Sequence, residues 1–285
     1  MAEEDRVSWQ ELDAELAATP GIVSAYVARL DRPPTYVRLP RQRHYAASTM
    51  KVAVLAALYR AAEAGTIDLD APVPVRNTFD SALPGAAAFG CARDYDNDPT
   101  VWERLGGQAS LRWLARRMIT RSSNLATNLV LGHVGLPAVA EVWRRVGAQH
   151  SVTARGIEDF AARDAGLDNL VTAADLAALL GAIATNRLAT PATCADMLEV
   201  LLAQQRREDL PAGLPPGTRI AHKNGWVRGV RHAAGVVFPD DAPPYAVVVC
   251  TSADPAAGDR DAAACQLIAR VSRTAWLARH DLAPN

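Results

Sequence analysis

Two residues that could form a nucleophilic pair, Ser48 and Lys51, stand three positions apart in the STMK run of 48–51. Residues three apart on a helix share a face, so the Lys51 amine can reach the Ser48 hydroxyl. A serine at a helix start also lies beside free backbone N–H groups, which can hold a developing oxyanion. An uncharged amine there can take the hydroxyl proton and activate the serine. The alternative is an N-cap serine followed by an exposed lysine, and this pair alone does not exclude it.

Lysine usage gives a second indication. Of the 30 basic residues, only Lys51 and Lys223 are lysine, and the other 28 are arginine. A guanidinium keeps its proton in a protein, whereas an ammonium loses it when desolvated or placed near another cation. We therefore expect both lysines to occupy positions that need a deprotonatable amine.

Two further motifs follow in the chain, Ser-Ser-Asn at 122–124 and Lys-Asn-Gly at 223–225. The later one contains the second lysine and falls on a predicted strand. In order and separation, the three motifs resemble the Ser-x-x-Lys, Ser-Asp-Asn and Lys-Thr-Gly motifs of the penicillin-recognising serine enzymes. The chain thus resembles the class A β-lactamase-related serine hydrolases over most of its length.

This resemblance implies a role for each matching residue. Ser48 would form the acyl-enzyme, and its own N–H would contribute to the oxyanion hole. Ser122 would relay a proton to the leaving nitrogen, while Asn124 would hydrogen-bond the substrate amide. Lys223 would attract the substrate carboxylate, and Gly225 would leave room for a substrate along the strand edge. No cofactor and no metal ion are implied.

The resemblance also concerns the step that releases the acyl group. Glu158 stands where class A β-lactamases carry the glutamate that activates the deacylating water. The alternatives are a solvated loop glutamate at 158, or Asp159 as the catalytic carboxylate. Two matching positions depart from the family. Ser123 replaces the motif aspartate, an internal structural residue in the family, and we expect this loss to be tolerated. Ala162 replaces an asparagine that helps to position the water, and we therefore expect poor deacylation of β-lactams.

The third motif departs from the family as well. Asn224 replaces a threonine whose hydroxyl meets the substrate carboxylate, although we retain Asn224 as a binding residue. Trp226 is expected to line the cleft, or to pack on a neighbouring strand residue. Of Arg228 and Arg231, one could reinforce anion binding while the other forms a surface salt bridge. His222 should point away from Lys223 on the strand and is expected to be structural.

Apolar spacing and turn residues divide the chain into a helix, two strands, a block of helices, three strands and a last helix. The predicted helices cover 7–18, 48–64, 111–118, 124–134, 136–146, 172–184, 191–203 and 259–278. The predicted strands cover 21–30, 35–39, 219–226, 232–238 and 245–251. Residues 66–100 are rich in Pro, Gly and Asp and are expected to loop over the surface, and 209–216 to form a linker.

Strands from both ends of the chain that enclose a helical block predict one antiparallel sheet with flanking helices beside an all-helical lobe. This two-lobed α+β arrangement is also the β-lactamase/transpeptidase-like fold that the resemblance implies. We expect one domain over 1–285, with an α/β lobe over about 1–45 and 205–285 and a helical lobe over about 46–204. Catalytic clefts often lie between such lobes.

The bulk composition argues against several other functions. The formal net charge of −1 gives no indication of a nucleic-acid partner. No apolar run reaches the roughly 18 residues that span a bilayer, so no membrane partner is expected. The four cysteines are widely spaced, which favours buried reduced thiols over a disulfide or a metal site. The acidic start lacks the layout of a secretory signal, which predicts a cytoplasmic protein, or a periplasmic or secreted one if a leader has been trimmed.

The sequence therefore predicts a serine hydrolase that forms an acyl-enzyme on Ser48 and acts on an amide or ester such as a β-lactam. Its partner is expected to be a small acyl substrate with a carboxylate. Two alternatives stay open: a transacylase or D,D-peptidase-like enzyme that passes the acyl group to an amine, and a non-catalytic carboxylate-binding protein on the same fold. The acylation base is either Lys51 or a water bound by Glu158, and no oligomeric state is predicted.

Overall fold

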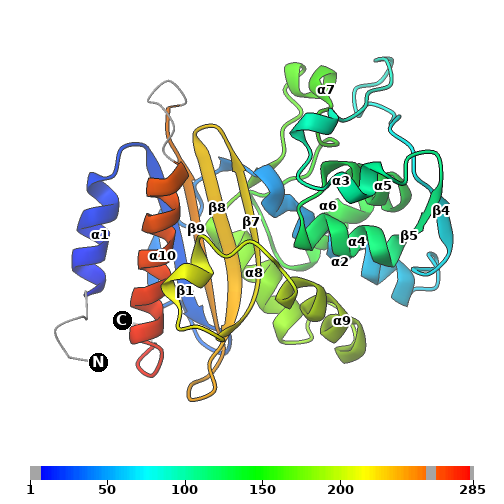
Figure 1. Cartoon of the computed structure of the whole chain (residues 1–285). Coiled ribbons are helices and arrows are strands. Elements are labelled where there is room, and N and C mark those ends of the chain that lie inside the picture. Colours follow the sequence, from blue (N-terminus) through cyan, green and yellow to red (C-terminus); the bar gives the residue numbers. More distant parts are fainter. Residues whose placement is uncertain (1–7, 255–260, 283–285) are drawn as a thin grey trace.

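A five-stranded antiparallel sheet forms one half of the structure, a computed structural model that describes residues 8–254 and 261–282 (Figure 1). The strand order is β2-β1-β9-β8-β7. The strands are β1 (Ile22–Arg29), β2 (Tyr36–Arg38), β7 (Arg219–Val227), β8 (Val230–Phe238) and β9 (Tyr245–Ser252). Because β1 pairs with β9 along its whole length, with Ala25 opposite Val249, the two ends of the chain share one sheet. This confirms the α+β fold class.

Helices cover both faces of this sheet. Helices α1 (Trp9–Ala18) and α10 (Asp261–Leu277) lie on one face, and α8 (Ala173–Ala184) contacts β1, β8 and β9 on the other (Figure 1). Residues of β9 alternate between two apolar cores: Val247 and Val249 pack beneath α1 and α10, whereas Val248 joins the core of the helical half. A strand covered on both faces is apolar throughout, which explains the Val-rich sequence of β9.

The second half is helical and surrounds α2 (Lys51–Glu63). From Val52 to Tyr59 the side chains of α2 are all buried, so this helix is apolar on every side and forms the centre of the lobe. The other helices of this half are α3 (Pro99–Trp102), α4 (Leu111–Thr120), α5 (Asn124–Val134), α6 (Leu136–Arg145), α7 (Phe160–Asp164) and α9 (Pro191–Leu202).

The start of the predicted 48–64 helix differs from the prediction. Residues Ala47–Met50 form a 3-10 turn, η2, and the α-helix begins at Lys51. Ala47 has a φ of 43°, which turns the chain sharply out of the short strand β3 (His44–Tyr45) into η2. Strand β3 pairs with β6 (Leu170–Val171), and together they connect the sheet to the helical half.

Residues 66–100 are mostly irregular and mostly exposed or half-buried, as predicted, but they also contain short regular elements. They contain β4 (Pro72–Pro74), which pairs with β5 (Gln108–Ser110), a bridge between Phe79 and Phe89, and the 3-10 turn η3 (Arg93–Tyr95). Their polar side chains are used for hydrogen bonds to residues 155–160 and to α5. The predicted linker at 209–216 likewise contains a 3-10 turn, η4 (Leu210–Gly213), which packs on α10.

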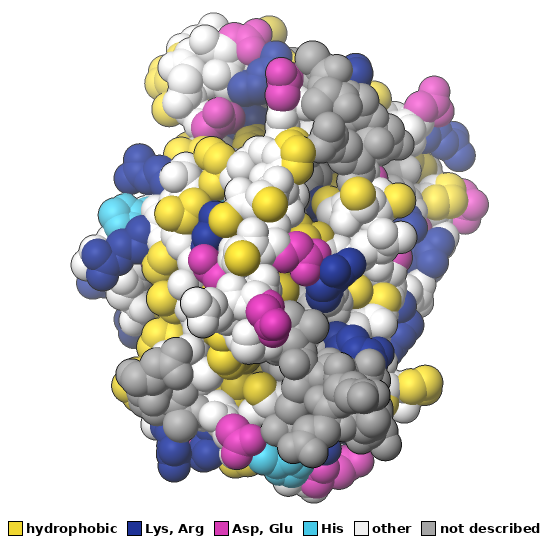
Figure 2. Space-filling model, turned by 90° about the vertical axis from the view of Figure 1, so that its left-hand side faces the viewer, with side chains coloured by type: hydrophobic (Ala, Val, Ile, Leu, Met, Phe, Trp, Pro, Cys, Tyr) yellow, Lys and Arg dark blue, Asp and Glu magenta, His cyan; other side chains and the backbone are white. Residues whose placement is uncertain are grey.

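The ends of the chain agree with the prediction as far as they are described. Ser8 caps α1 and exchanges hydrogen bonds with Glu11, which forms a capping box. The predicted starts of the first and last helices, residue 7 and residues 259–260, lie outside the described residues. On the face formed by α1 and α10, basic and acidic side chains are intermixed, in keeping with the balanced net charge (Figure 2).

In the described part of the chain, no single helix is long and apolar enough to cross a bilayer. The bent pair α5 and α6, which meet at 87°, reaches that length and apolarity only when taken together.

Candidate active site

The three motifs meet where the outer edge of β7 faces the helical half. Strand β7 ends the sheet and lies against η2, the turn that carries Ser48 (Figure 1). Ser48 lines a cavity of about 950 Å³ between the two halves. Other parts of the wall come from the 92–97 segment, Asn124 at the start of α5, the 155–168 segment and the tip of the β7–β8 hairpin.

Gly225 brings β7 into contact with the nucleophile turn. A Cβ atom at this position would lie 2.6 Å from the Ser48 backbone nitrogen and 2.9 Å from that of Thr49. Only glycine allows so close an approach. The sequence predicted that this glycine leaves room for a substrate, and the structure adds that it leaves room for η2 itself.

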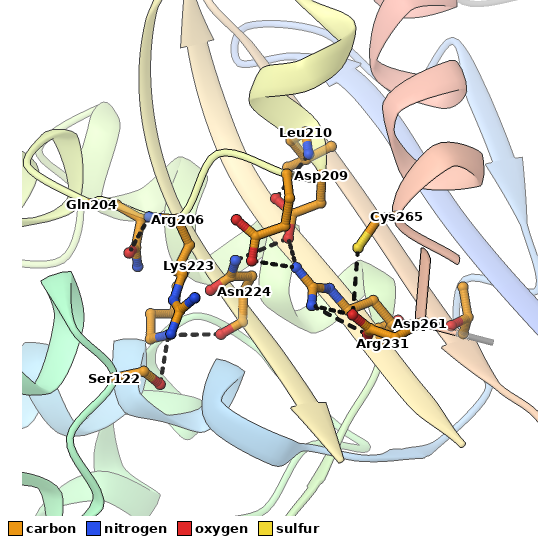
Figure 3. A network of polar contacts seen from close by, with 12 residues as sticks. Ser122, Gln204, Arg206, Asp209, Leu210, Lys223, Asn224, Arg231, Asp261 and Cys265 are labelled. Atoms are coloured by element: carbon orange, nitrogen blue, oxygen red, sulfur yellow. Dashed lines mark hydrogen bonds and ion pairs between the residues drawn. The ribbon is translucent and has the colours of Figure 1, made fainter. Parts of the chain in front are cut away.

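The only two lysines of the chain converge on Ser122. The Lys51 amine donates to the Ser122 carbonyl at 2.8 Å and to Asn124 Oδ1 at 2.9 Å. The Lys223 amine donates to the Ser122 hydroxyl at 3.1 Å and to the Asn224 carbonyl at 2.7 Å (Figure 3). Both lysines are fully buried, so the alternative of an exposed lysine at 51 is wrong.

Burial lowers the pKa of both amines. The pKa of Lys51 falls to about 8, because desolvation outweighs the opposing effects of Asp96, Cys91 and Glu158. Burial also holds the pKa of Lys223 well below its usual range, and the nearby Lys51 charge adds to this effect. An amine with a pKa near 8 is uncharged in part of the molecules at neutral pH and can then accept a proton.

The amine of Lys51 does not contact the nucleophile directly in this structure. Its hydrogen bonds run to residues 122–124, and none joins it to Ser48 within the described residues. Catalytic hydrogen bonds are often long in a free enzyme and shorten when substrate binds. The arrangement places Lys51 beside the proton relay at Ser122 and on the helix that begins directly after η2.

Ser122 has the left-handed backbone conformation that is unusual for a residue with a side chain, with a φ of 62°. It precedes α5, where Ser123 is the N-cap and accepts a hydrogen bond from Ala126 N–H at 3.1 Å. The turn presents both the carbonyl and the hydroxyl of Ser122 to the lysines. Such strain costs about 1 to 3 kcal/mol and persists only where neighbouring contacts hold it.

Glu158 lines the same cavity as Ser48, whereas Asp159 does not. Glu158 is 8% exposed, so it is not a solvated loop residue. Its Oε2 accepts the Ala92 N–H at 2.8 Å, and its Oε1 has no partner within the described residues. Burial raises the pKa of Glu158, and the Ala92 N–H partly offsets this. Asp159 is fully buried and accepts hydrogen bonds from Ser81 and Ala82 at 2.8 Å each, a structural use.

Two asparagines that the sequence did not single out hold the Glu158 segment. Asn128 pairs with the Ile157 backbone through its side-chain amide: Nδ2 donates to the Ile157 carbonyl and Oδ1 accepts the Ile157 N–H, at 2.8 Å each. Asn77 pairs in the same way with the Cys91 backbone, at 2.9 and 2.8 Å, and so fixes the N–H of residue 92. Asn128 stands one helical turn after Asn124, which was the one available sign that it faces the site.

Asn224 does not line the cavity, and its side chain points toward a buried ion pair (Figure 3). It is fully buried, and its Nδ2 donates to Asp209 at 2.9 Å. Asp209 in turn pairs with Arg231 at 2.8 Å, and Arg231 also pairs with Glu208 and Asp261. Arg231 therefore forms the predicted salt bridge, but its guanidinium is buried, and its pair with Asp209 lies inside the protein.

The tip of the β7–β8 hairpin completes the cavity. Trp226 lines it, and the centre of its ring lies 5.2 Å from the guanidinium carbons of both Arg206 and Arg231. Arg228 lines the cavity too, is exposed, and has no ion-pair partner within the described residues. His222 is buried on β7, does not line the cavity, and has no hydrogen-bond partner within the described residues.

Comparisons with known proteins agree with this arrangement. The family model of the beta-lactamase enzyme family matches residues 8–278. A curated beta-lactamase from Rhodobacter capsulatus is 33% identical over 121 residues, which cover 41% of this chain and 36% of that protein. The chain thus matches about a third of the length of that relative.

Solved structures are similar over nearly the whole chain. A beta-lactamase from Sphaerobacter thermophilus superposes with a TM-score of 0.79 at 26% identity and covers 98% of this chain and 100% of its own. The structure of PBP-A superposes with a TM-score of 0.79 at 23% identity, with 96% of both chains covered. At this identity the similarity shows a shared fold. A variant of PBP-A was solved as an acyl-enzyme complex with penicillin G.

Proposed function

Since the chain belongs to the beta-lactamase enzyme family and is a serine enzyme of that family, we propose that it hydrolyses a small amide or ester, such as a β-lactam, through an acyl-enzyme on Ser48. The observation that carries the proposal is the convergence of two buried lysines on Ser122 beside the cavity that Ser48 lines. A protein that only bound a carboxylate would need no deprotonatable amine there, which speaks against the non-catalytic alternative.

In the proposed acylation step, the uncharged Lys51 amine takes the proton of the Ser48 hydroxyl as its oxygen attacks the substrate carbonyl. The negative charge that develops on the carbonyl oxygen is stabilised by the Ser48 N–H at the junction of η2 and β7. When the carbon–nitrogen bond breaks, Ser122 donates its proton to the leaving nitrogen and recovers one from Lys51. Lys223 attracts the substrate carboxylate toward the same end of the cavity.

In the proposed deacylation step, Glu158 takes a proton from a water molecule that attacks the acyl carbon, and Ser48 leaves with a proton returned to its oxygen. The free Oε1 of Glu158 supports this role. Ala162 is fully buried and apolar, so it offers no amide to orient the water. That observation favours slow hydrolysis, and it also favours the second candidate function, transfer of the acyl group to an amine.

One experiment tests both candidates. The protein is incubated with a chromogenic cephalosporin and with a labelled penicillin, while hydrolysis and the mass of the adduct are followed over time. Rapid turnover supports hydrolysis. A long-lived adduct whose lifetime becomes shorter when an amine is added supports transfer. If neither these substrates nor a fluorophosphonate or activated-ester probe modifies Ser48, the serine-nucleophile proposal is wrong. Ser48→Ala is the matched control.

A further inference from the structure

Asp96 follows η3 and is half-buried at the wall of the cavity that Ser48 lines. Its Oδ2 accepts three hydrogen bonds: from the Leu125 N–H at 2.8 Å, the Ser123 hydroxyl at 3.1 Å and the Trp102 indole N–H at 3.1 Å. Two of these donors belong to the start of α5. A residue of the 66–100 segment therefore holds the segment that carries the second motif.

The start of α5 is a place where a carboxylate is favoured. The first N–H groups of a helix lack partners inside the helix, and they carry partial positive charge. Ser123, the N-cap, is neutral, so the negative charge at this helix start comes from Asp96. Ser122 directly precedes the cap in its strained conformation, which needs such contacts to persist.

The same segment also acts on Lys51. Asn124 accepts a hydrogen bond from the Lys51 amine through Oδ1, while its Nδ2 donates to the Tyr95 carbonyl at 3.4 Å. The residue before Asp96 thus orients the amide that Lys51 contacts. The negative charge of Asp96 raises the pKa of Lys51, against the larger effect of burial.

The position of Asp96 is itself fixed. Two residues later, Asp98 is fully buried and accepts a hydrogen bond from Arg117 Nε of α4 at 2.5 Å. Its other oxygen accepts the Thr100 N–H at 3.2 Å and caps α3. The Asp98 N–H also donates to Asp96 Oδ1 at 3.1 Å, so the chain directly after Asp96 is anchored and helps to fix its carboxylate.

We propose that Asp96 is a positioning residue that supplies, from a distant segment, the carboxylate that the second motif lacks at Ser123. It holds Ser122 and Asn124 in place and keeps a negative charge near Lys51. The proposal deepens the proposed function and rests on it for its kinetic test, whereas its titration test needs no substrate.

The titration test uses the presence of only two lysines in the chain. Lysine labelled at Cε with carbon-13 gives two NMR signals, which Lys223→Arg assigns, and their pH dependence reports the pKa of Lys51. We expect Asp96→Asn to lower this pKa, and Asp96→Asn with Ser123→Asp to move it back toward the parent value. If the pKa of Lys51 does not move in Asp96→Asn, the proposal is refuted whatever the protein does to β-lactams.

The kinetic test measures acylation of Ser48 by a chromogenic cephalosporin. We expect Asp96→Ala to slow acylation by about 10²-fold, the effect of a small misplacement of reacting groups. Adding Ser123→Asp to Asp96→Ala should recover at least about tenfold of that loss. Asp80→Ala, an exposed aspartate of the same segment, is the control and should acylate at the parent rate.

The outcomes separate this proposal from the proposed function. A parent protein that is not acylated contradicts the proposed function, and the titration then decides on Asp96. An acylated parent with an unaffected Asp96→Ala variant contradicts the role of Asp96 alone. A double variant no faster than Asp96→Ala would mean that the carboxylate cannot be supplied from position 123, which also overturns the proposal.

Discussion

The Gly225→Ala substitution tests how closely β7 and η2 must approach for Ser48 to react. The added Cβ atom would lie 2.6 Å from the Ser48 nitrogen, 2.9 Å from the Thr49 nitrogen and 3.2 Å from the Ala47 Cβ. The two shortest contacts are with backbone atoms. No side-chain rotation can therefore relieve them, and either β7 or η2 must move.

The size of the effect follows from these distances. Ordinary contacts of a Cβ atom begin at 3.4 Å, so the Ser48 nitrogen and β7 must separate by about 0.8 Å. A displacement of about 1 Å at a reacting group costs about 10²-fold in rate. Overpacking of this kind destabilises a protein by about 1 to 3 kcal/mol. We expect acylation to slow by about 10²-fold. The free energy of unfolding should fall by no more than about 3 kcal/mol, and the fold should be retained.

Acylation is measured under single-turnover conditions with a chromogenic cephalosporin, and the free energy of unfolding by urea titration. The control is Gly132→Ala, because a Cβ atom at that position on α5 meets no atom within 4 Å. This control should acylate at the parent rate. If Gly225→Ala also acylates at the parent rate, close contact of β7 with η2 is not needed for the reaction, and the argument from these distances fails.

Three further predictions concern the amine, the glutamate and the buried histidines. Lys51→Arg should abolish detectable acylation while leaving the circular dichroism spectrum unchanged, because a guanidinium stays protonated; a normal adduct mass in this variant would contradict proton transfer to Lys51. Glu158→Gln should prolong the lifetime of the adduct more than it slows adduct formation, and equal effects on both steps would argue against a role in deacylation. Burial lowers the pKa of His44 and His222 to about 3 and that of His232 to about 4 in the folded state, so the unfolded chain binds protons first as pH falls. Their contribution to stability should be fully present above pH 6.5 and fall at lower pH by up to about 1.4 kcal/mol per pH unit for each histidine, until the folded pKa values are reached. Urea titrations between pH 7 and pH 5 measure this slope, and a flat profile would contradict neutral burial of these side chains.

The fold was largely predictable from local patterns. The Val-rich run of β9 and the Ala- and Leu-rich run of α2 are apolar on all sides, and both elements are buried on all sides. Strands at the two ends of the chain predicted a shared sheet, which the pairing of β1 with β9 confirms. The hydrophobic pattern did not predict where α2 starts, because η2 follows from the φ of Ala47, and η2 packs against β7.

The surroundings of the third-motif side chains could not be predicted from the sequence. Alternation along a strand predicts that Asn224 faces away from Lys223, but not what it meets there. The structure supplies the answer through Asp209 and Arg231, which come from the segment before β7 and from β8. The motif resemblance had suggested a binding role for Asn224, because it describes residue types and not the surroundings of one particular protein.

The sequence by itself determined which residues could do chemistry: a serine and a lysine one turn apart, a second serine and the only other lysine, in the order of a known set of motifs. Only the tertiary structure decided that the two lysines meet at Ser122, that Glu158 rather than Asp159 faces the cavity, and that Asp96 stands at the start of α5. The physical reason is the same in each case. Motifs are local, whereas burial, pKa and hydrogen-bond partners depend on segments far apart in the chain, and the polar 66–100 segment carries no local sign of what it will pack against.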